Sequence, residues 1–415
     1  MAVIRQCQTL TKARLMARAP IRHYDLFINE EDDQTEGLED LQDIDPLLVQ
    51  EVVVNSTDWT TETLISQINK GNIELDPTFQ RRDAWTGKRK SAFIESLILG
   101  LPIPQIVLAE RRDSRGQYIV IDGKQRLLSL RQFVSPRDDL VFERYALSGL
   151  SVRSDLNGID YEQFSTSGRF IREFNGFENQ TIRTIVIKNW QDERVLYQIF
   201  LRLNTGSVPL SPQELRQALH PGPFVQYVDQ TSASSAALRF ILGNTKPDFR
   251  MRDAEILVRY YAFRYFAAHY RGNLKRFLDE TCENLNESWA EREGQIRERY
   301  EQFENAVYWV SQIFNEDAFR KWKDGRFERL FNRAIFDIMS FYFSLPEVLA
   351  VVAGREEAVK AAFIELSRND PAFVDSLETT TKSTRSTRLR FERWANTLSQ
   401  VLNIELPVPV PEVAG

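Results

Sequence analysis

The stretch QYIVIDGKQRLLSLRQF (residues 117–133) decides the fold of the first half of the chain. It begins with an apolar run, which is typical of a buried β-strand, and continues with leucines at helical spacing. Gly123 stands between the two parts, where a residue without a Cβ lets the backbone turn sharply. We therefore predict a strand that passes through Asp122-Gly123 directly into a helix over 124–133.

Regular elements are also predicted on both sides of this stretch. Two short apolar runs, at 105–109 and 117–121, predict a β-hairpin because a polar segment separates them. Apolar spacing predicts a helix that begins near Thr60 or Thr61, either of which could be its N-cap. Apolar spacing and turn residues also predict a helix over 87–100, a strand over 181–188 and a helix over 192–203. Beyond about Ser211 the pattern is helical, with helices expected over 253–270, 290–314, 326–343, 355–366 and 387–402.

This order of elements predicts the fold class α+β, with an α+β domain followed by an all-helical domain. We expect an acidic, disordered segment over 1–50, because its like charges repel one another. The first domain is expected over 51–220 and the helical domain over 221–405. Residues 406–415 are expected to be a frayed tail.

Composition removes several classes of protein. The 415 residues include 53 Lys and Arg against 59 Asp and Glu, and the net charge of −6 requires any phosphate-binding surface to be a local patch. Two cysteines cannot form a disulfide framework, so we expect a cytoplasmic protein. Three widely spaced histidines exclude an H-E-x-x-H zinc site. No apolar run approaches the ~18 residues that span a bilayer, so no membrane partner is expected.

The segment 79–126 is a candidate anion-binding patch. It holds ten basic and five acidic residues, a local net charge of +5. The alternative is a solvated helix face and a hairpin tip, which need no ligand.

The turn at Gly123 suggests a more specific interpretation. A helix that begins there offers unpaired N–H groups and the positive end of its dipole, which suit a phosphate. Lys124 and Arg126 would add positive charge, and Asp122 could hold a metal ion, cap the helix or orient Arg126. The alternative is a capped turn with a surface arginine. No G-x-x-x-x-G-K-[ST] motif occurs, which excludes P-loop chemistry.

Two further motifs strengthen the functional interpretation. PTFQR (residues 77–81) places Arg81 ahead of the helix over 87–100. LRLNTG (201–206) is followed by LSPQELR (210–216), in which Ser at N-cap, Pro at N1 and Glu at N3 predict a capping box.

Together these motifs resemble the N-terminal domain of GmrSD-type, modification-dependent restriction proteins, a domain related to the ParB/sulfiredoxin fold. The resemblance rests on FQR with Trp85, FIESL and LPIP (93–104), IDGKQR (121–126), RLNTG and ELR. The family signature is D-G-Q-Q-R, and this chain has Lys124 in place of the first glutamine. The resemblance implies binding and often hydrolysis of a nucleoside triphosphate, coupled to DNA recognition or cleavage in phage defence.

The resemblance also implies the site residues. In ParB-like relatives a G-x-x-R-x-x-A element holds nucleotide phosphates, and this chain has serine for the alanine. The implied nucleotide-binding residues are Gly123, Lys124, Gln125, Arg126, Ser129, Arg202 and Asn204. The implied catalytic residues are Asp122, Arg126 and Arg81, with Asp122 as the candidate ligand of a Mg²⁺ ion.

Two alternative functions stay open at this stage. A Mg²⁺-dependent DNA nuclease would use Asp122 and Lys124, with Glu110 or Asp113 as a second carboxylate. A DNA-binding module without catalysis would use the basic stretch over 381–393, through Arg385, Arg388 and Arg390.

The nuclease of full GmrSD-type enzymes is a C-terminal His-Asn-His domain, which needs a histidine base. The only histidine after His220 is His269, in an aromatic run that indicates a packed or surface residue. We therefore expect a partner subunit to supply the nuclease, with DNA as a further partner. Hydrolysis of the nucleotide and a homo-oligomer are left open.

Overall fold

The computed structural model describes residues 50–75, 84–203, 211–378 and 382–411. They form two compact units. Among the described residues, one unit comprises those up to Leu219 together with Phe249–Met251, and the other comprises His220–Asp248 and those from Arg252 onward. The first unit combines a sheet with helices and the second is mainly helical, so the predicted α+β class is confirmed.

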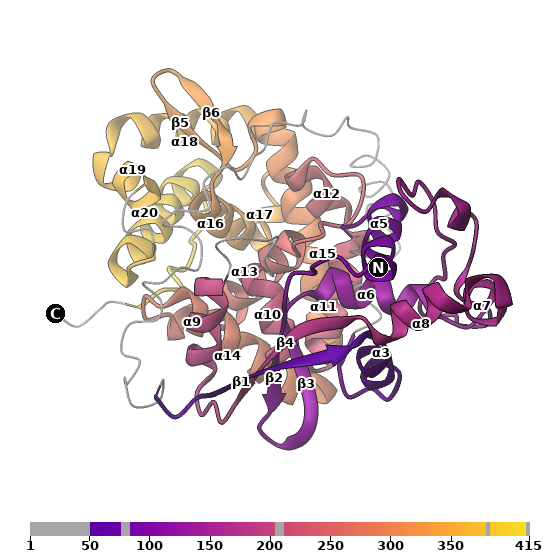
Figure 1. The fold of residues 1–415 in the computed structure, drawn as a ribbon. Coiled ribbons are helices and arrows are strands. Elements are labelled where there is room, and N and C mark those ends of the chain that lie inside the picture. The colour runs from indigo at the N-terminus through magenta and orange to yellow at the C-terminus, as the bar shows by residue number, and fades with distance from the viewer. Residues whose placement is uncertain (1–49, 76–83, 204–210, 379–381, 412–415) are drawn as a thin grey trace. The chain divides into compact units, whose positions relative to one another are not determined.

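The first unit is built on a four-stranded mixed sheet with the order β1-β4-β2-β3 (Figure 1). The strands are β1 (Val53–Thr60), β2 (Ile106–Arg111), β3 (Ser114–Asp122) and β4 (Thr181–Lys188). Only the central pair, β2 with β4, is parallel among the strands of this sheet. The predicted hairpin and the predicted strand over 181–188 are thus both present.

Helices pack on both faces of this sheet. One face contacts α3 (Thr61–Asn69), α5 (Gly87–Ile98), α6 (Lys124–Phe133) and α8 (Ile171–Asn179). The other face contacts α9 (Glu193–Leu203) and α10 (Pro212–Leu219). Alternate residues of β2 therefore enter two different apolar cores, which explains why its sequence is a continuous apolar run.

Side-chain caps fix where these helices begin. The Thr60 hydroxyl accepts a hydrogen bond from the Thr63 N–H at 3.1 Å, and Thr86 caps α5 in the same way. A short helix, α7 (Tyr161–Thr166), begins at a capping box on Asp160. Because these caps are local, they are the features that sequence can predict most directly.

The second unit consists of helices and one hairpin. Its helices are α11 (Pro223–Ser234), α12 (Ala236–Leu242), α13 (Arg252–Phe266), α14 (Leu274–Glu287), α15 (Trp289–Phe314), α16 (Arg333–Phe343), α17 (Pro346–Leu349), α18 (Glu356–Asn369), α19 (Pro371–Glu378) and α20 (Thr384–Leu402). Aromatic side chains fill its interior, and Trp394 of α20 lies edge-on to Phe363 of α18 with both fully buried.

The hairpin, β5 (Arg320–Lys323) and β6 (Arg326–Phe331), corrects one prediction. The helix expected from Arg326 begins only at Arg333. Asp324 and Gly325 form the turn with φ values of 51° and 81°, which is the left-handed geometry that Asp-Gly favours between two strands. The helical spacing of the surrounding residues concealed this turn signal.

The tail is also more ordered than predicted. Val410 is fully buried, and the Tyr342 hydroxyl donates a hydrogen bond to the Pro407 carbonyl at 2.8 Å. Arg388 donates to the Val410 carbonyl at 2.7 Å. The acidic segment predicted over 1–50 lies almost entirely outside the described residues.

A search of the described helices for a membrane span found none with the necessary length and apolar character.

Candidate functional site

The turn between β3 and α6 has the geometry that only glycine tolerates. Gly123 is the N-cap of α6, with φ 99° and ψ 10°, and no side chain caps the helix. A methyl group on Gly123 would lie 3.0 Å from Ile106 Cγ1 and 3.2 Å from Arg126 Nη2. Both the backbone angle and the lack of space therefore require glycine.

The guanidinium of Arg126 lies against this turn. Its Nη2 donates to Asp122 Oδ2 at 3.0 Å and to the Gln105 carbonyl at 2.9 Å. Its Nε is buried without a hydrogen-bond partner. Arg126 is only 8% exposed, so the alternative of a surface arginine is wrong. Of the tasks considered for Asp122, orienting Arg126 is the one that the structure displays.

The side chain of Lys124 forms a buried ion pair within the protein. Its Nζ lies 2.5 Å from Glu214 Oε1, and both side chains are about 5% exposed. Glu214 is the N3 residue of the predicted capping box, which is present: its Oε2 accepts from the Ser211 N–H, and the Ser211 hydroxyl accepts from the Glu214 N–H. Lys124 is the residue that departs from the family signature, and its positive charge is thus neutralised by Glu214 of the LSPQELR motif.

Ser129 and Gln125 both belong to α6. The Ser129 hydroxyl is fully buried and donates to the Gln125 carbonyl at 2.7 Å, so it faces the core. This burial argues against contact with a nucleotide and explains why a small residue is needed there. Gln125 Oε1 is buried without a hydrogen-bond partner.

Three predicted residues cannot be placed. Arg81 and Asn204 lie outside the described residues, and so does the side chain of Arg202 at the end of α9. Their roles remain predictions.

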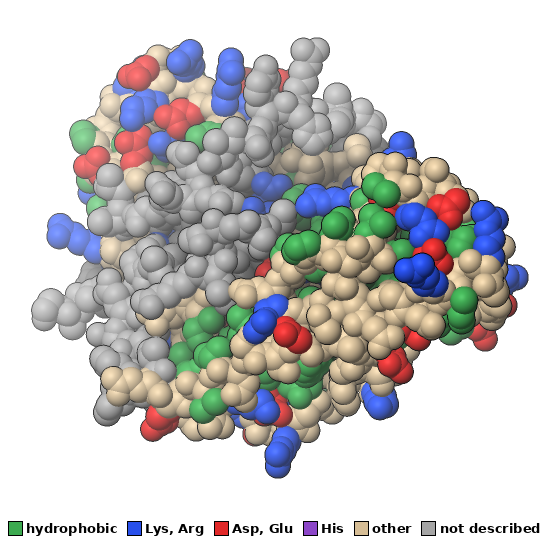
Figure 2. Space-filling model, in the orientation of Figure 1, with side chains coloured by type: hydrophobic (Ala, Val, Ile, Leu, Met, Phe, Trp, Pro, Cys, Tyr) green, Lys and Arg blue, Asp and Glu red, His purple; other side chains and the backbone are tan. Residues whose placement is uncertain are grey.

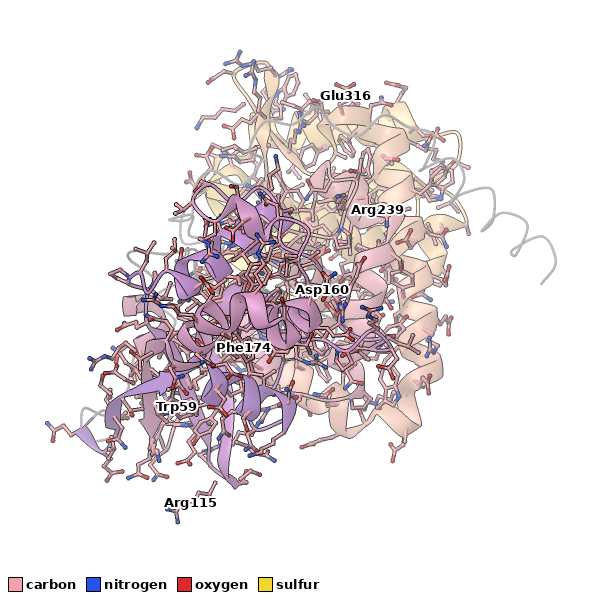
Figure 3. The ribbon with its side chains drawn as sticks, turned by 45° about the vertical axis from the view of Figure 1, so that its right-hand side comes forward. Trp59, Arg115, Asp160, Phe174, Arg239 and Glu316 are labelled. Carbon is pink, nitrogen blue, oxygen red and sulfur yellow. The ribbon has the colours of Figure 1, made fainter. Side chains whose placement is uncertain are left out.

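The strand register contradicts the nuclease alternative. Asp122 pairs with Val107, whereas Glu110 pairs with Tyr118. Tyr118 and Asp122 are four residues apart, so the two carboxylates are separated by roughly 13 Å along the hairpin. Glu110 instead accepts from the Gly116 N–H, and Asp113 is exposed near the hairpin tip, where Figure 3 shows Arg115 projecting outward. With Lys124 bound to Glu214, no two-carboxylate metal site forms around Asp122 among the described residues.

The basic segment over 79–126 is divided among separate partners. Arg111 forms an ion pair with Glu74, Arg112 donates to the Gln191 carbonyl and Arg89 lies over the ring of Trp85. Figure 2 also shows basic and acidic side chains intermixed on the drawn face of the first unit, and Arg144 forms an ion pair with Asp160, the N-cap residue of α7. The described part of the segment is therefore not one continuous anion-binding patch.

The predicted DNA-binding arginines differ in exposure. Arg390 is 1% exposed, and it shares Asp337 with Arg259, so the prediction that it contacts DNA is wrong. Its guanidinium would have to leave the core to reach a phosphate. Arg388 is half-buried against the Val410 carbonyl, and only Arg385 of the three is exposed.

The sequence did not reveal two contacts that hold the site and its supporting helix. The Gln105 carbonyl positions Arg126, and no sequence pattern marks a backbone acceptor. Glu95, within FIESL, accepts from the N–H groups of Val152 and Arg153 at 2.9 and 2.7 Å. Glu95 therefore connects α5 to the loop of Val152 and Arg153, which follows α6 along the chain.

Comparison with protein families gives a match over part of the chain. Residues 61–221 match the family described as "GmrSD restriction endonuclease, N-terminal domain". The match begins at α3 and ends just beyond α10, so it contains the Gly123 turn and the Lys124–Glu214 pair. Neither the curated proteins nor the solved structures gave a match.

Proposed function

Because residues 61–221 carry a GmrSD-type N-terminal domain, we propose that the chain binds a nucleoside triphosphate at the Gly123 turn as part of a DNA restriction system. The single observation that carries the proposal is the Arg126 guanidinium. It is buried beside an uncapped helix N-terminus and its Nε has no partner.

Phosphate recognition follows from this arrangement. The first turn of α6 presents N–H groups and the positive end of the helix dipole, because no side chain caps it. Asp122 and the Gln105 carbonyl hold Arg126 in one orientation, which lowers the entropy lost when the guanidinium binds an anion. We assign phosphate contacts to the backbone of α6 and to Arg126, and none to the Lys124 ammonium.

A Mg²⁺ ion fits this site through one carboxylate. Asp122 Oδ2 accepts from Arg126, and Oδ1 is left for a metal ion that the nucleotide phosphates also bind. Magnesium sites with substrate phosphates commonly use only one or two carboxylates. When bound, the ion would neutralise phosphate charge, while Arg126 would orient the phosphate group.

The test compares two arginines of the same helix. Arg126→Lys keeps the positive charge but loses the guanidinium fork, whereas Arg131→Lys alters an arginine that is paired with Asp139. Calorimetric titration with the four nucleoside triphosphates and Mg²⁺ should show an affinity about tenfold or more weaker for Arg126→Lys. Arg131→Lys should bind like the unchanged chain. Equal affinities in the two variants, or no binding by the unchanged chain, would overturn the proposal.

Hydrolysis and DNA cleavage are separate questions. We propose that phosphate release, if the site hydrolyses its nucleotide, depends on Asp122, and that a partner subunit cuts the DNA. Asp122→Asn should abolish Mg²⁺-dependent phosphate release measured with a colorimetric assay. The same purified chain should leave plasmid DNA intact until the partner is added, and cutting by the chain alone would contradict the partner assignment.

A further inference from the structure

A cavity in the second unit is lined by two arginines that form no ion pair with a carboxylate of the described residues. It has a volume of about 570 Å³ and lies among the last turn of α13, the middle of α15 and the start of α17. Its lining residues are Arg264, Gln295, Glu298, Arg299, Gln302, Leu345, Pro346 and Glu347. This volume is within the range of small-molecule sites.

Arg264 and Arg299 form the inner part of the cavity. Both are half-buried, and neither forms an ion pair with a carboxylate of the described residues. Arg264 packs over the ring of Phe341 and its Nε is buried without a hydrogen-bond partner. Arg299 donates to Gln302 Oε1 at 2.8 Å and lies 5.8 Å from the ring centroid of Tyr265. Packing therefore holds both guanidinium groups in place.

The two positive charges act on each other. Burial lowers the pKa of Arg264 and the positive charge of Arg299 lowers it further, while Tyr260 and Glu347 act in the opposite direction without cancelling the decrease. Two cations that share one cavity repel, and an anion placed between them removes the repulsion. Guanidinium groups match the oxygen geometry of a phosphate.

The outer part of the cavity has a different character. Gln295, Glu298 and Glu347 are exposed. Their oxygens accept hydrogen bonds, and two carboxylates at the rim disfavour a ligand that carries only negative charge. A ligand with a phosphate at one end and hydroxyl groups at the other satisfies both parts.

We propose that this cavity, which we call the Arg264–Arg299 cavity, binds a phosphorylated sugar, either free or as part of a nucleotide. The phosphate lies between Arg264 and Arg299, and the sugar hydroxyl groups donate to Glu298 and Glu347. This site is separate from the proposed triphosphate site, because all of its residues belong to the second unit.

The experiment is a calorimetric titration of the full chain with ribose 5-phosphate, adenosine monophosphate, inorganic phosphate and ribose. All titrations use the Arg126→Lys chain as well as the unchanged chain, so that a loss of the triphosphate site does not affect the result. We expect binding of ribose 5-phosphate at concentrations up to about 5 mM and no binding of ribose. Tighter binding of adenosine monophosphate would identify the nucleotide as the source of the sugar phosphate, and equal binding would identify the free sugar phosphate.

Variants locate the site. The single variant Arg299→Gln and the double variant Arg264→Gln with Arg299→Gln should each weaken the binding of ribose 5-phosphate about tenfold or more. The matched control is Arg297→Gln, an exposed arginine of α15 that is paired with Glu293 and should leave binding unchanged. Arg299→Gln is the safer variant for folding because Arg264 packs on Phe341. Binding that survives in Arg299→Gln with an unchanged melting temperature, or inorganic phosphate that binds as tightly as the sugar phosphate, overturns the proposal.

Discussion

The buried pair of Lys124 and Glu214 makes each residue depend on the other. With both side chains about 5% exposed, removing one partner leaves an uncompensated charge in the core. We expect Lys124→Met to lower the free energy of unfolding of the first unit by about 3–5 kcal/mol. The measurement is urea denaturation followed by circular dichroism.

A second substitution separates the charge from the packing. Glu214→Gln keeps an oxygen to accept from the Ser211 N–H but carries no charge. Added to Lys124→Met, it should recover more than half of the lost stability. If the double variant is less stable than Lys124→Met alone, the pair does not act through its charges.

Glu95 should make the free energy of unfolding depend on pH. Burial raises its pKa, but hydrogen bonds from the N–H groups of Arg153, Val152 and Ser151 lower it more, so the net pKa lies below the usual 4.5. A carboxyl whose pKa is lowered by folding stabilises the folded form fully above the unfolded value, and this stabilisation is lost as the pH falls from 4.5 through the folded pKa. The unchanged chain should therefore exceed Glu95→Gln in stability at pH 6, and the difference should shrink below pH 4.5. Unfolding free energies measured across this range would contradict the role of Glu95 if the difference stayed constant.

For single residues, the sequence predicts the structural role of some and not of others. Gly123 and the Ser211 capping box were identified because local backbone geometry requires those residue types. The fate of Lys124 was not, because its partner is 90 residues away along the chain. Nor did helical spacing show that Arg390 faces inward, since a basic stretch at the start of a helix is also typical of an exposed face.

The β5–β6 hairpin depends on its two-residue turn. Gly325 has φ 81° and no atom within 4 Å of the position a Cβ would take, so an alanine there is strained only by its backbone. Gly325→Ala should destabilise the second unit by about 1–2 kcal/mol in urea denaturation. The matched control is Gly294→Ala, in open space within α15, which should stabilise by about 0.5–1 kcal/mol. Equal effects would show that the turn geometry is not what fixes the hairpin.

Elements were predicted best where one local signal was sufficient. The strand over 181–188 and the helix that begins after Thr60 agree with the structure because caps and apolar runs act within a few residues. The hairpin before α16 was missed although Asp-Gly marks it, since the apolar spacing on either side also suits a helix. The buried end of the tail was missed because Val410 is held by the distant residues Tyr342 and Arg388.

For the whole molecule, the two proposed sites should respond to different ligands. The Gly123 turn belongs to the first unit and the Arg264–Arg299 cavity to the second. Hydrogen exchange measured with Mg²⁺ and a nucleoside triphosphate should slow in α6, and ribose 5-phosphate should slow it in α15. Protection by the triphosphate that is confined to α15 would contradict the assignment of the first site.

The position of β2 in the sheet has a consequence for biosynthesis. β2 and β3 are translated well before β4, yet β2 needs β4 for its parallel hydrogen bonds. Until Thr181–Lys188 leaves the ribosome, β2 of the nascent chain has an unpaired, apolar strand edge that can associate with other chains. Fragments truncated ahead of Thr181 should therefore precipitate on expression, whereas those that extend past Leu219 should remain in the supernatant.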